Sequence, residues 1–149
     1  MAVTAEQVEA AYRALETGDR EAIGRYWAED MRWIVPGNHQ LAGAWEGLDG
    51  FLTFMGHVGK LSGGSFQMIR SAIMVSEDMS ADVSHNEGSL VDASDAPTPY
   101  DHLVIDVVHV LRWQDGKVVE GRGAIFEDGT TRFNQFWSQV RQDGTRVPL

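Results

Sequence analysis

The sequence predicts an α+β fold, in which a curved and mostly antiparallel sheet wraps over three N-terminal helices and a short helix follows at the C-terminal end. Two patterns lead to this prediction. Apolar residues recur at helical spacing early in the chain, and they alternate with polar residues from about residue 66 onward. The 149 residues contain no repeat and no interdomain linker, so residues 1–149 are expected to form a single domain.

The three N-terminal helices are predicted from caps and apolar stripes. Thr4 and Gln7 form a capping box ahead of the first amphipathic stretch. Asp19 is expected to cap a second helix, whose apolar stripe runs as far as Trp27. A third helix is predicted over about residues 51–62, because its apolar side chains share one face and a Gly-Gly pair then ends it.

Alternation of apolar and polar residues predicts five strands. They lie at about residues 31–35, 66–76, 80–91, 100–113 and 117–126. Asp115 and Gly116 favour a tight hairpin between the last two strands. The polar, glycine-bearing segment 38–47 is expected to be a loop, and the last helix is predicted over about 130–140. A sheet curled over helices in this order forms a cone, and we expect its interior to be a pocket.

The composition excludes several classes of partner and chemistry. The net charge is −10, from 22 acidic and 12 basic residues, so a phosphate backbone would be repelled and we expect no nucleic-acid partner. The chain has no cysteine, which excludes disulfides and thiolate catalysis. No apolar run approaches the roughly 20 residues that span a bilayer, and no signal pattern precedes the first helix. We therefore expect a cytoplasmic protein without a membrane partner.

His109 interrupts an otherwise apolar row of the fourth predicted strand. The residues that share its row are Leu103, Ile105, Val107, Leu111 and Trp113. Such a histidine is either a core residue satisfied by one hydrogen bond, or a functional group in the wall of a cavity. The second reading attracts attention because a neutral imidazole accepts a proton at one nitrogen and donates from the other. The choice depends on whether the core behind this strand is solid or hollow.

Several stretches of the sequence resemble a known family. They are "ALETGDREAI", "AEDMRWIVPG", "LAGAWEGLDGFLTF", "LSGGSF", "VLRWQDGKVVEG" and "FNQFW". In this order they are similar to the SnoaL-like branch of the nuclear-transport-factor-two-like superfamily, which includes ketosteroid isomerase, scytalone dehydratase, limonene epoxide hydrolase and polyketide cyclases. The resemblance implies the cone fold with an interior pocket. It does not imply one reaction, because this fold carries isomerases, lyases, hydrolases and binding proteins.

The resemblance also suggests which pocket positions have changed. Val35 occupies the position that matches the catalytic base of ketosteroid isomerase, so that base is absent. Tyr12 resembles the isomerase's oxyanion tyrosine on the first helix, and His109 matches the protonated aspartic acid that is its second oxyanion donor. The carboxylates of limonene epoxide hydrolase are not recovered. The histidines and tyrosines are closer in type to those of scytalone dehydratase.

Three residues are therefore predicted to be catalytic. We expect His109 to act as general acid/base or oxyanion donor, Tyr12 as hydrogen-bond donor on the same substrate oxygen, and His85 as a second acid/base group. His85 is placed inward because its row on the strand 80–91 is the more apolar one, although a solvent-exposed face is nearly as compatible with the pattern. The predicted substrate-binding residues are Trp33, Val35, His39, Phe54, Glu87, Val107 and Leu111.

The leading functional hypothesis is a cofactor-free enzyme that carries out acid/base chemistry on an apolar carbonyl or polyketide-like metabolite. The reaction would be an isomerisation, a dehydration or an aldol-type cyclisation. One alternative is a non-catalytic protein that binds an apolar small ligand, and a further alternative is an epoxide hydrolase that uses Glu87 to activate water. A metal site formed by His85, His109 and Glu87 is disfavoured, because spacing alone supports it.

The outer face of the strand 100–113 predicts an oligomer. Three valines, Val104, Val108 and Val110, alternate with charged residues on this face. Apolar residues on the exposed side of a sheet need a cover. An isologous homodimer, in which two sheets pack face to face, is the simplest such cover, and the relatives pair in this way.

Overall fold

The computed structural model describes residues 2–91, 99–138 and 145. Its elements are α1 (Ala5–Glu16), α2 (Arg20–Gly24), β1 (Trp27–Val35), β2 (Gly43–Glu46), α3 (Gly47–Ser62), β3 (Gln67–Val75), β4 (Met79–Ser89), the 3-10 turn η1 (Pro99–Asp101), β5 (His102–Gln114), β6 (Lys117–Ile125) and α4 (Gly129–Trp137). The predicted α+β architecture is confirmed. Within these described residues, no helix is long and apolar enough to cross a membrane.

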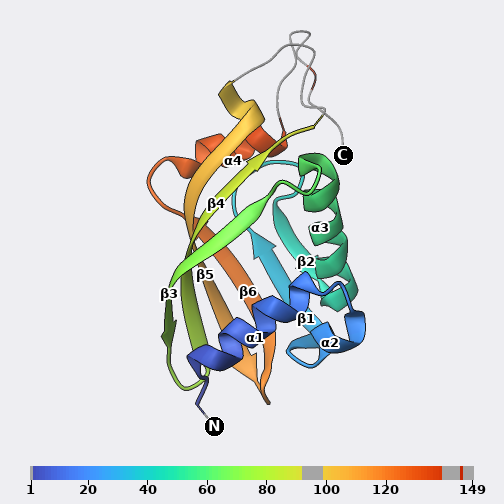
Figure 1. Ribbon diagram of the computed structural model, residues 1–149, viewed down its shortest axis with the longest axis vertical. Helices are drawn as coiled ribbons and strands as arrows, with labels where there is room; N and C mark the ends of the chain where they lie inside the picture. Colours follow the sequence, from blue (N-terminus) through green and yellow to red (C-terminus); the bar gives the residue numbers. More distant parts are fainter. Residues whose placement is uncertain (1, 92–98, 139–144, 146–149) are drawn as a thin grey trace.

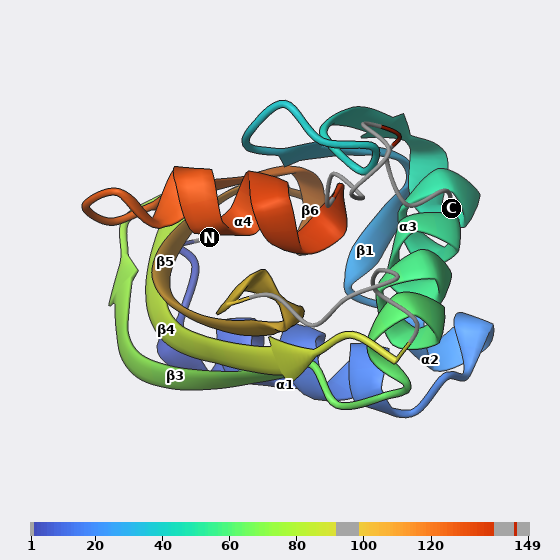
Figure 2. The same ribbon diagram turned by 90° about the horizontal axis from the view of Figure 1, so that it is seen from above.

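A single six-stranded sheet organises the fold. The strand order is β2-β1-β6-β5-β4-β3, and the β1–β6 pair is parallel while the other pairs are antiparallel. Figure 2 shows that β3, β4 and β5 curl around an interior, with α4 crossing above it and α3 along one side. In Figure 1, α1 and α2 lie near the opposite end from α4. The helices and the curled sheet thus form the predicted cone.

The helix ends follow the local sequence signals. The Thr4 hydroxyl accepts a hydrogen bond from the amide of Gln7 at 3.2 Å, and the Gln7 side chain accepts one from the amide of Thr4 at 2.9 Å. This capping box satisfies two backbone donors that have no partner inside the helix. Gly63 ends α3 in the left-handed conformation, with φ of 59°, which glycine adopts without a side-chain clash.

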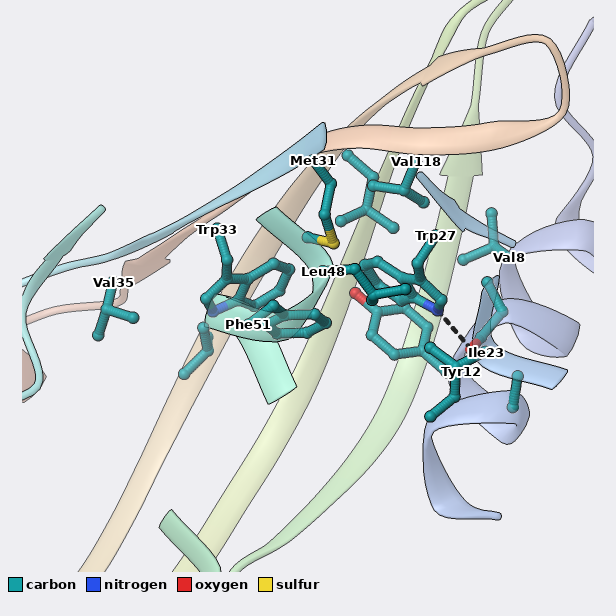
Figure 3. Packing of buried hydrophobic residues seen from close by; sticks show 14 of the residues in the cluster. Val8, Tyr12, Ile23, Trp27, Met31, Trp33, Val35, Leu48, Phe51 and Val118 are labelled. Atoms are coloured by element: carbon teal, nitrogen blue, oxygen red, sulfur yellow. Dashed lines mark hydrogen bonds between the residues drawn. The ribbon is translucent and has the colours of Figure 1, made fainter. Parts of the chain in front are cut away.

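The second helix is shorter than the sequence predicts. It ends at Gly24, and Trp27 is the first residue of β1, where it pairs with Val118 of β6. The Trp27 indole is fully buried, and its N–H donates to the carbonyl oxygen of Ala11 at 2.9 Å, which is the dashed line in Figure 3. Helical spacing alone did not reveal that strand pairing and this hydrogen bond would hold Trp27 in an extended segment.

The predicted loop over residues 38–47 contains a short strand. Strand β2 pairs with β1 in antiparallel register, so that Trp45 lies opposite Trp33. The Trp45 indole donates to the carbonyl oxygen of Leu41 at 3.0 Å. Four residues of mixed polarity give no recognisable alternation, which is why this edge strand was not predicted.

An aromatic stack forms the centre of the core. Phe51 of α3 packs against both Trp27 and Trp33, with ring centroids 5.1 and 4.7 Å apart (Figure 3). Gly121 of β6 makes this arrangement possible, because a Cβ at that position would overlap the Trp33 ring. The last helix is confirmed as far as Trp137. Ser138 is no longer helical, and residues 139–140 of the predicted span lie outside the described residues.

Candidate active site

The core behind β5 is hollow. The His109 row faces inward as predicted, and it borders a cavity of about 520 Å³ between the sheet and the helices. The cavity is lined mainly by apolar side chains. Of the residues expected to contact a substrate or catalyse, those that line it are Tyr12, Trp33, Val35, Phe54, Val107 and His109.

Strand β4 faces the opposite way from the prediction. Its inward row is polar, and the buried members are Ser80, Asp82, Ser84 and Asn86. Hydrogen bonds partner three members of this row: Ser84 donates to Asn86 Oδ1 at 2.8 Å, and the Trp113 indole donates to the Ser80 hydroxyl at 2.9 Å. Internal hydrogen bonds thus offset the desolvation of this row, so polarity was a poor guide to its facing.

A buried carboxylate links the two residues that the sequence singled out. Asp82 has no exposed surface, and its Oδ2 accepts a hydrogen bond from the Tyr12 hydroxyl at 2.7 Å. Its other oxygen, Oδ1, lies 3.4 Å from Nδ1 of His109. Neither Oδ1 nor Nδ1 has a hydrogen-bond partner among the described residues, so a small rotation that brings them together satisfies both.

Tyr12 retains its proton in this environment. Burial is the main cause of the rise in its pKa well above the ordinary value, and the negative charge of Asp82 adds to it, whereas the charge of Arg70 acts in the opposite direction. The hydroxyl proton points to Asp82. The prediction that Tyr12 donates directly to a substrate oxygen is therefore not supported by this geometry, and Tyr12 instead positions the carboxylate.

The imidazole of His109 presents different nitrogens to its two sides. Nδ1 lies toward Asp82, whereas Nε2 lies on the side of Gly123, which lines the cavity. A carboxylate at Nδ1 favours the tautomer with the proton on that nitrogen, which leaves the lone pair of Nε2 for the cavity. The ring packs against Trp33 with centroids 5.5 Å apart, which fixes its plane.

His85 does not lie in the cavity, and its predicted inward orientation is wrong. It is on the outer face of the sheet, where Nδ1 lies 2.9 Å from Asp106 Oδ1 and Nε2 lies 3.0 Å from Glu87 Oε1. The hydrogen bond to the Asp106 carboxylate is the main cause of a raised pKa of His85, and the hydrogen bond to Glu87 adds to it. Glu87 is therefore also remote from the cavity. Among the described residues, no group of three His, Asp or Glu side chains is arranged to hold a metal ion.

Two other predicted contact residues are buried but do not line the cavity. His39 accepts a hydrogen bond at Nδ1 from the amide of Leu41, 3.1 Å away, and its Nε2 is 2.9 Å from the carbonyl oxygen of Pro36. Burial lowers the pKa of His39 to about 4, so this loop histidine is neutral at pH 7. Leu111 is fully buried and lies against Gly121.

Two functional candidates were missed by sequence reasoning. Asp82 was assigned to the outer row of its strand, and Arg70 of β3, which lines the cavity, was not singled out. In the structure Asp82 pairs with His109, and paired residues point to the same face of the sheet, so the strand register reveals that Asp82 faces inward. That register requires the strand pairing, which one sequence does not provide.

Comparison with known proteins assigns the family. A family model described as the SnoaL-like domain matches residues 8–121, which is more than half of the chain. The chain belongs to the SnoaL-like domain family. This finding confirms the resemblance seen in the sequence and agrees with the cone fold. No curated protein matches the sequence significantly.

Several solved structures have a fold similar to that of this chain. Bal32a, from a soil-derived mobile gene cassette, is 23% identical, with 89% of this chain and 95% of that chain covered and a TM-score of 0.74. A Xanthomonas campestris protein of unknown function with a cystatin-like fold is 27% identical, with the same coverage and a TM-score of 0.73. A proposed SnoaL-like polyketide cyclase from Jannaschia is 17% identical, with 81% and 85% covered and a TM-score of 0.62.

Proposed function

We propose that this SnoaL-like protein is an enzyme that moves a proton on a small, mainly apolar carbonyl compound. The observation that supports the proposal best is the Tyr12–Asp82–His109 chain at the wall of an apolar cavity. A buried carboxylate that orients an imidazole gives a general base with a defined tautomer. The Jannaschia relative is described as a SnoaL-like polyketide cyclase, which is compatible with this class of chemistry.

In the proposed reaction, Nε2 of His109 removes a proton from the carbon next to a carbonyl group. Asp82 holds the proton of Nδ1 and stabilises the imidazolium that forms, while Tyr12 holds Asp82. Asn86 lines the cavity, and because its Oδ1 already accepts from Ser84, its NH₂ group is available to donate to the developing enolate oxygen. Return of the proton from His109 to another carbon gives isomerisation. Attack of the enolate carbon on a second carbonyl gives cyclisation, in which the imidazolium returns its proton to the alkoxide that forms.

The experiment that tests the proposal does not require the natural substrate. Each member of a panel of small cyclic ketones and polyketide fragments is incubated in D₂O, and uptake of deuterium next to the carbonyl is followed by NMR. We expect the wild type to accelerate uptake for some members, and His109→Gln to lose the acceleration. His85→Gln, a histidine change on the outer face, should behave as wild type. Equal uptake with wild type and His109→Gln across the panel would contradict the proposal.

A second candidate is a binding protein that holds an apolar ligand without catalysis. The apolar lining, which includes Val35, favours this candidate. Ligand binding without deuterium uptake would support it. The epoxide-hydrolase alternative relied on Glu87 to activate water, and Glu87 lies on the outer face of the sheet.

We also propose that two copies of the chain pair through the outer face of the sheet. Apolar residues remain exposed there: Ile69 is 61% exposed, Met74 52% and Val104 37%. Val108 lies between them and faces the same side. Arg112 and Glu120 lie opposite each other at the end of this face, so a two-fold pairing can bring unlike charges together.

A further inference from the structure

Arg70 is the cation of the cavity, and most of its side chain is covered. Among the described residues that line the cavity, the charged side chains are those of Arg70 and Glu16. Glu16 is exposed at the end of α1, whereas the Arg70 side chain is only 14% exposed. An arginine is seldom buried without a partner that compensates for the loss of hydration. The question is therefore which group provides that compensation.

The partners of Arg70 within the protein are incomplete. Its Nη2 makes one contact with Glu9 Oε2, at 3.3 Å. In the same chain, Arg20 binds both carboxylate oxygens of Glu29, at 2.9 and 2.7 Å, which is the geometry of a well-formed pair. The Nε of Arg70 is buried and has no hydrogen-bond partner among the described residues. The guanidinium thus retains donor capacity that the fold does not use.

The orientation of Arg70 leaves that capacity available. The guanidinium carbon lies 4.1 Å from the centroid of the Tyr12 ring, so the aromatic ring covers one flat face of the group. A guanidinium stacks through its face but donates hydrogen bonds in its plane, and two of these donors match the two oxygens of a carboxylate. Stacking on Tyr12 therefore holds the group in place without occupying its donors.

We propose that the substrate carries an anionic oxygen pair or an acidic enol, which Arg70 binds, joined to an apolar body that fills the rest of the cavity. This inference rests on the proposed function and narrows its substrate class. The proposal also explains why a cation lies inside a protein whose net charge is −10: the overall field disfavours an anion, and a buried arginine offsets that field locally. Recognition by Arg70 would fix one end of the substrate within the same cavity that His109 faces.

The test compares two ligands that differ in charge and hardly in shape. Binding of 2-naphthoate and of 2-naphthamide is measured by calorimetry at pH 7.5, where the acid is ionised. We expect the wild type to bind the carboxylate roughly tenfold or more tightly than the amide, the factor that one charge-assisted hydrogen bond provides. Equal affinity for the two ligands would overturn the proposal.

Variants separate Arg70 from other sources of charge preference. Arg70→Gln should bind both ligands with similar affinity, and Arg70→Lys should keep only part of the preference, since an ammonium lacks the planar fork. Glu9→Gln, a change at a half-exposed site that is compatible with folding, should bind the carboxylate more tightly and the amide unchanged, because a competing carboxylate is removed. A preference that persists in Arg70→Gln, or carboxylate binding that is unchanged in Glu9→Gln, would overturn the proposal.

The same measurement distinguishes this inference from the proposed function. His109→Gln should retain the preference for the carboxylate while it loses deuterium uptake. If His109→Gln loses uptake but the wild type binds both ligands equally, the substrate class is wrong and the acid/base function stands. If the preference depends on Arg70 but no uptake is seen with any member of the ketone panel, the cavity binds anions without the proposed proton transfer.

Discussion

The two oxygens of the Asp82 carboxylate lie beside different partners, Oδ2 at 2.7 Å from the Tyr12 hydroxyl and Oδ1 at 3.4 Å from Nδ1 of His109. One fully buried group thus lies between the two side chains. Because a tyrosine that donates to a carboxylate cannot donate the same proton to a substrate, in the proposed reaction Tyr12 acts through Asp82, and His109 is the residue that contacts the substrate.

Asp82→Asn should impair proton transfer with little effect on ligand binding. The amide NH₂ of an asparagine donates to an unprotonated Nδ1, which favours the tautomer with the proton on Nε2 and removes the base from the cavity side. We expect the rate of deuterium uptake to fall by roughly 10²–10⁴-fold, the usual contribution of a general base. Calorimetry with the ketone that is used in the uptake assay provides the binding control. A wild-type uptake rate in Asp82→Asn would show that the carboxylate does not orient the base.

Tyr12→Phe and Asp82→Asn should be non-additive in stability. Tyr12→Phe leaves a buried carboxylate oxygen without its donor, which should lower the free energy of unfolding by about 1–3 kcal/mol. In the Asp82→Asn background the same change should cost less, because the oxygen left unpaired belongs to a neutral amide. Urea denaturation of the two single variants and the double variant measures the coupling. Additive losses would indicate that the hydrogen bond does not contribute.

Val108→Lys should convert the proposed dimer into a monomer. The substitution places a charge in the middle of the outer sheet face, where pairing would bury it without a partner. Light scattering at micromolar concentration should give the mass of two chains for the wild type and of one chain for the variant. Ala44→Lys, the same type of change on the exposed part of edge strand β2, should remain dimeric. A monomeric wild type would exclude the dimer.

His85 should make stability decrease as the pH rises. Its pKa is raised in the folded protein by hydrogen bonds to Asp106 and Glu87, so the folded state binds the proton more tightly than the unfolded chain. The resulting stabilisation is fully present below the unfolded pKa of about 6.5 and is lost as the pH rises through the higher folded value. Urea denaturation between pH 5 and 9 should show this loss in the wild type and not in His85→Gln. High salt should weaken it, because the pair is exposed.

His39 should have the opposite effect on the pH dependence of stability. Burial lowers its folded pKa to about 4, so its ring resonances in an NMR titration should remain those of a neutral imidazole down to about pH 5. The unfolded chain takes up the proton first as the pH falls, so the stability due to neutral His39 is present above about 6.5 and is lost on acidification toward the folded pKa. Resonances that shift near pH 6.5 would show that the ring is hydrated.

Elements whose signals are local could be predicted from the sequence. The Thr4–Gln7 capping box, the αL glycine at Gly63 and the alternation along β5 each depend on residues that are neighbours in the chain. The inward position of His109 followed from the same alternation, because five large apolar residues share its row. Local chemistry is sufficient where one face of an element is clearly apolar.

Which residues form the candidate site depends on contacts between elements that are distant in the sequence. On β4 both rows are mixed, and a period of two cannot tell which one faces inward when Tyr12 of α1 and Trp113 of β5 donate hydrogen bonds to the buried row. Burial of the Asp82 carboxylate is compensated by the Tyr12 hydroxyl, which lies 2.7 Å from its Oδ2. The two residues are 70 positions apart in the sequence. His85 lies on the outer face, where it contacts Asp106 of the neighbouring strand β5. Such long-range pairings fix the free energy of a polar side chain, and they exist only once the sheet has curled around the cavity.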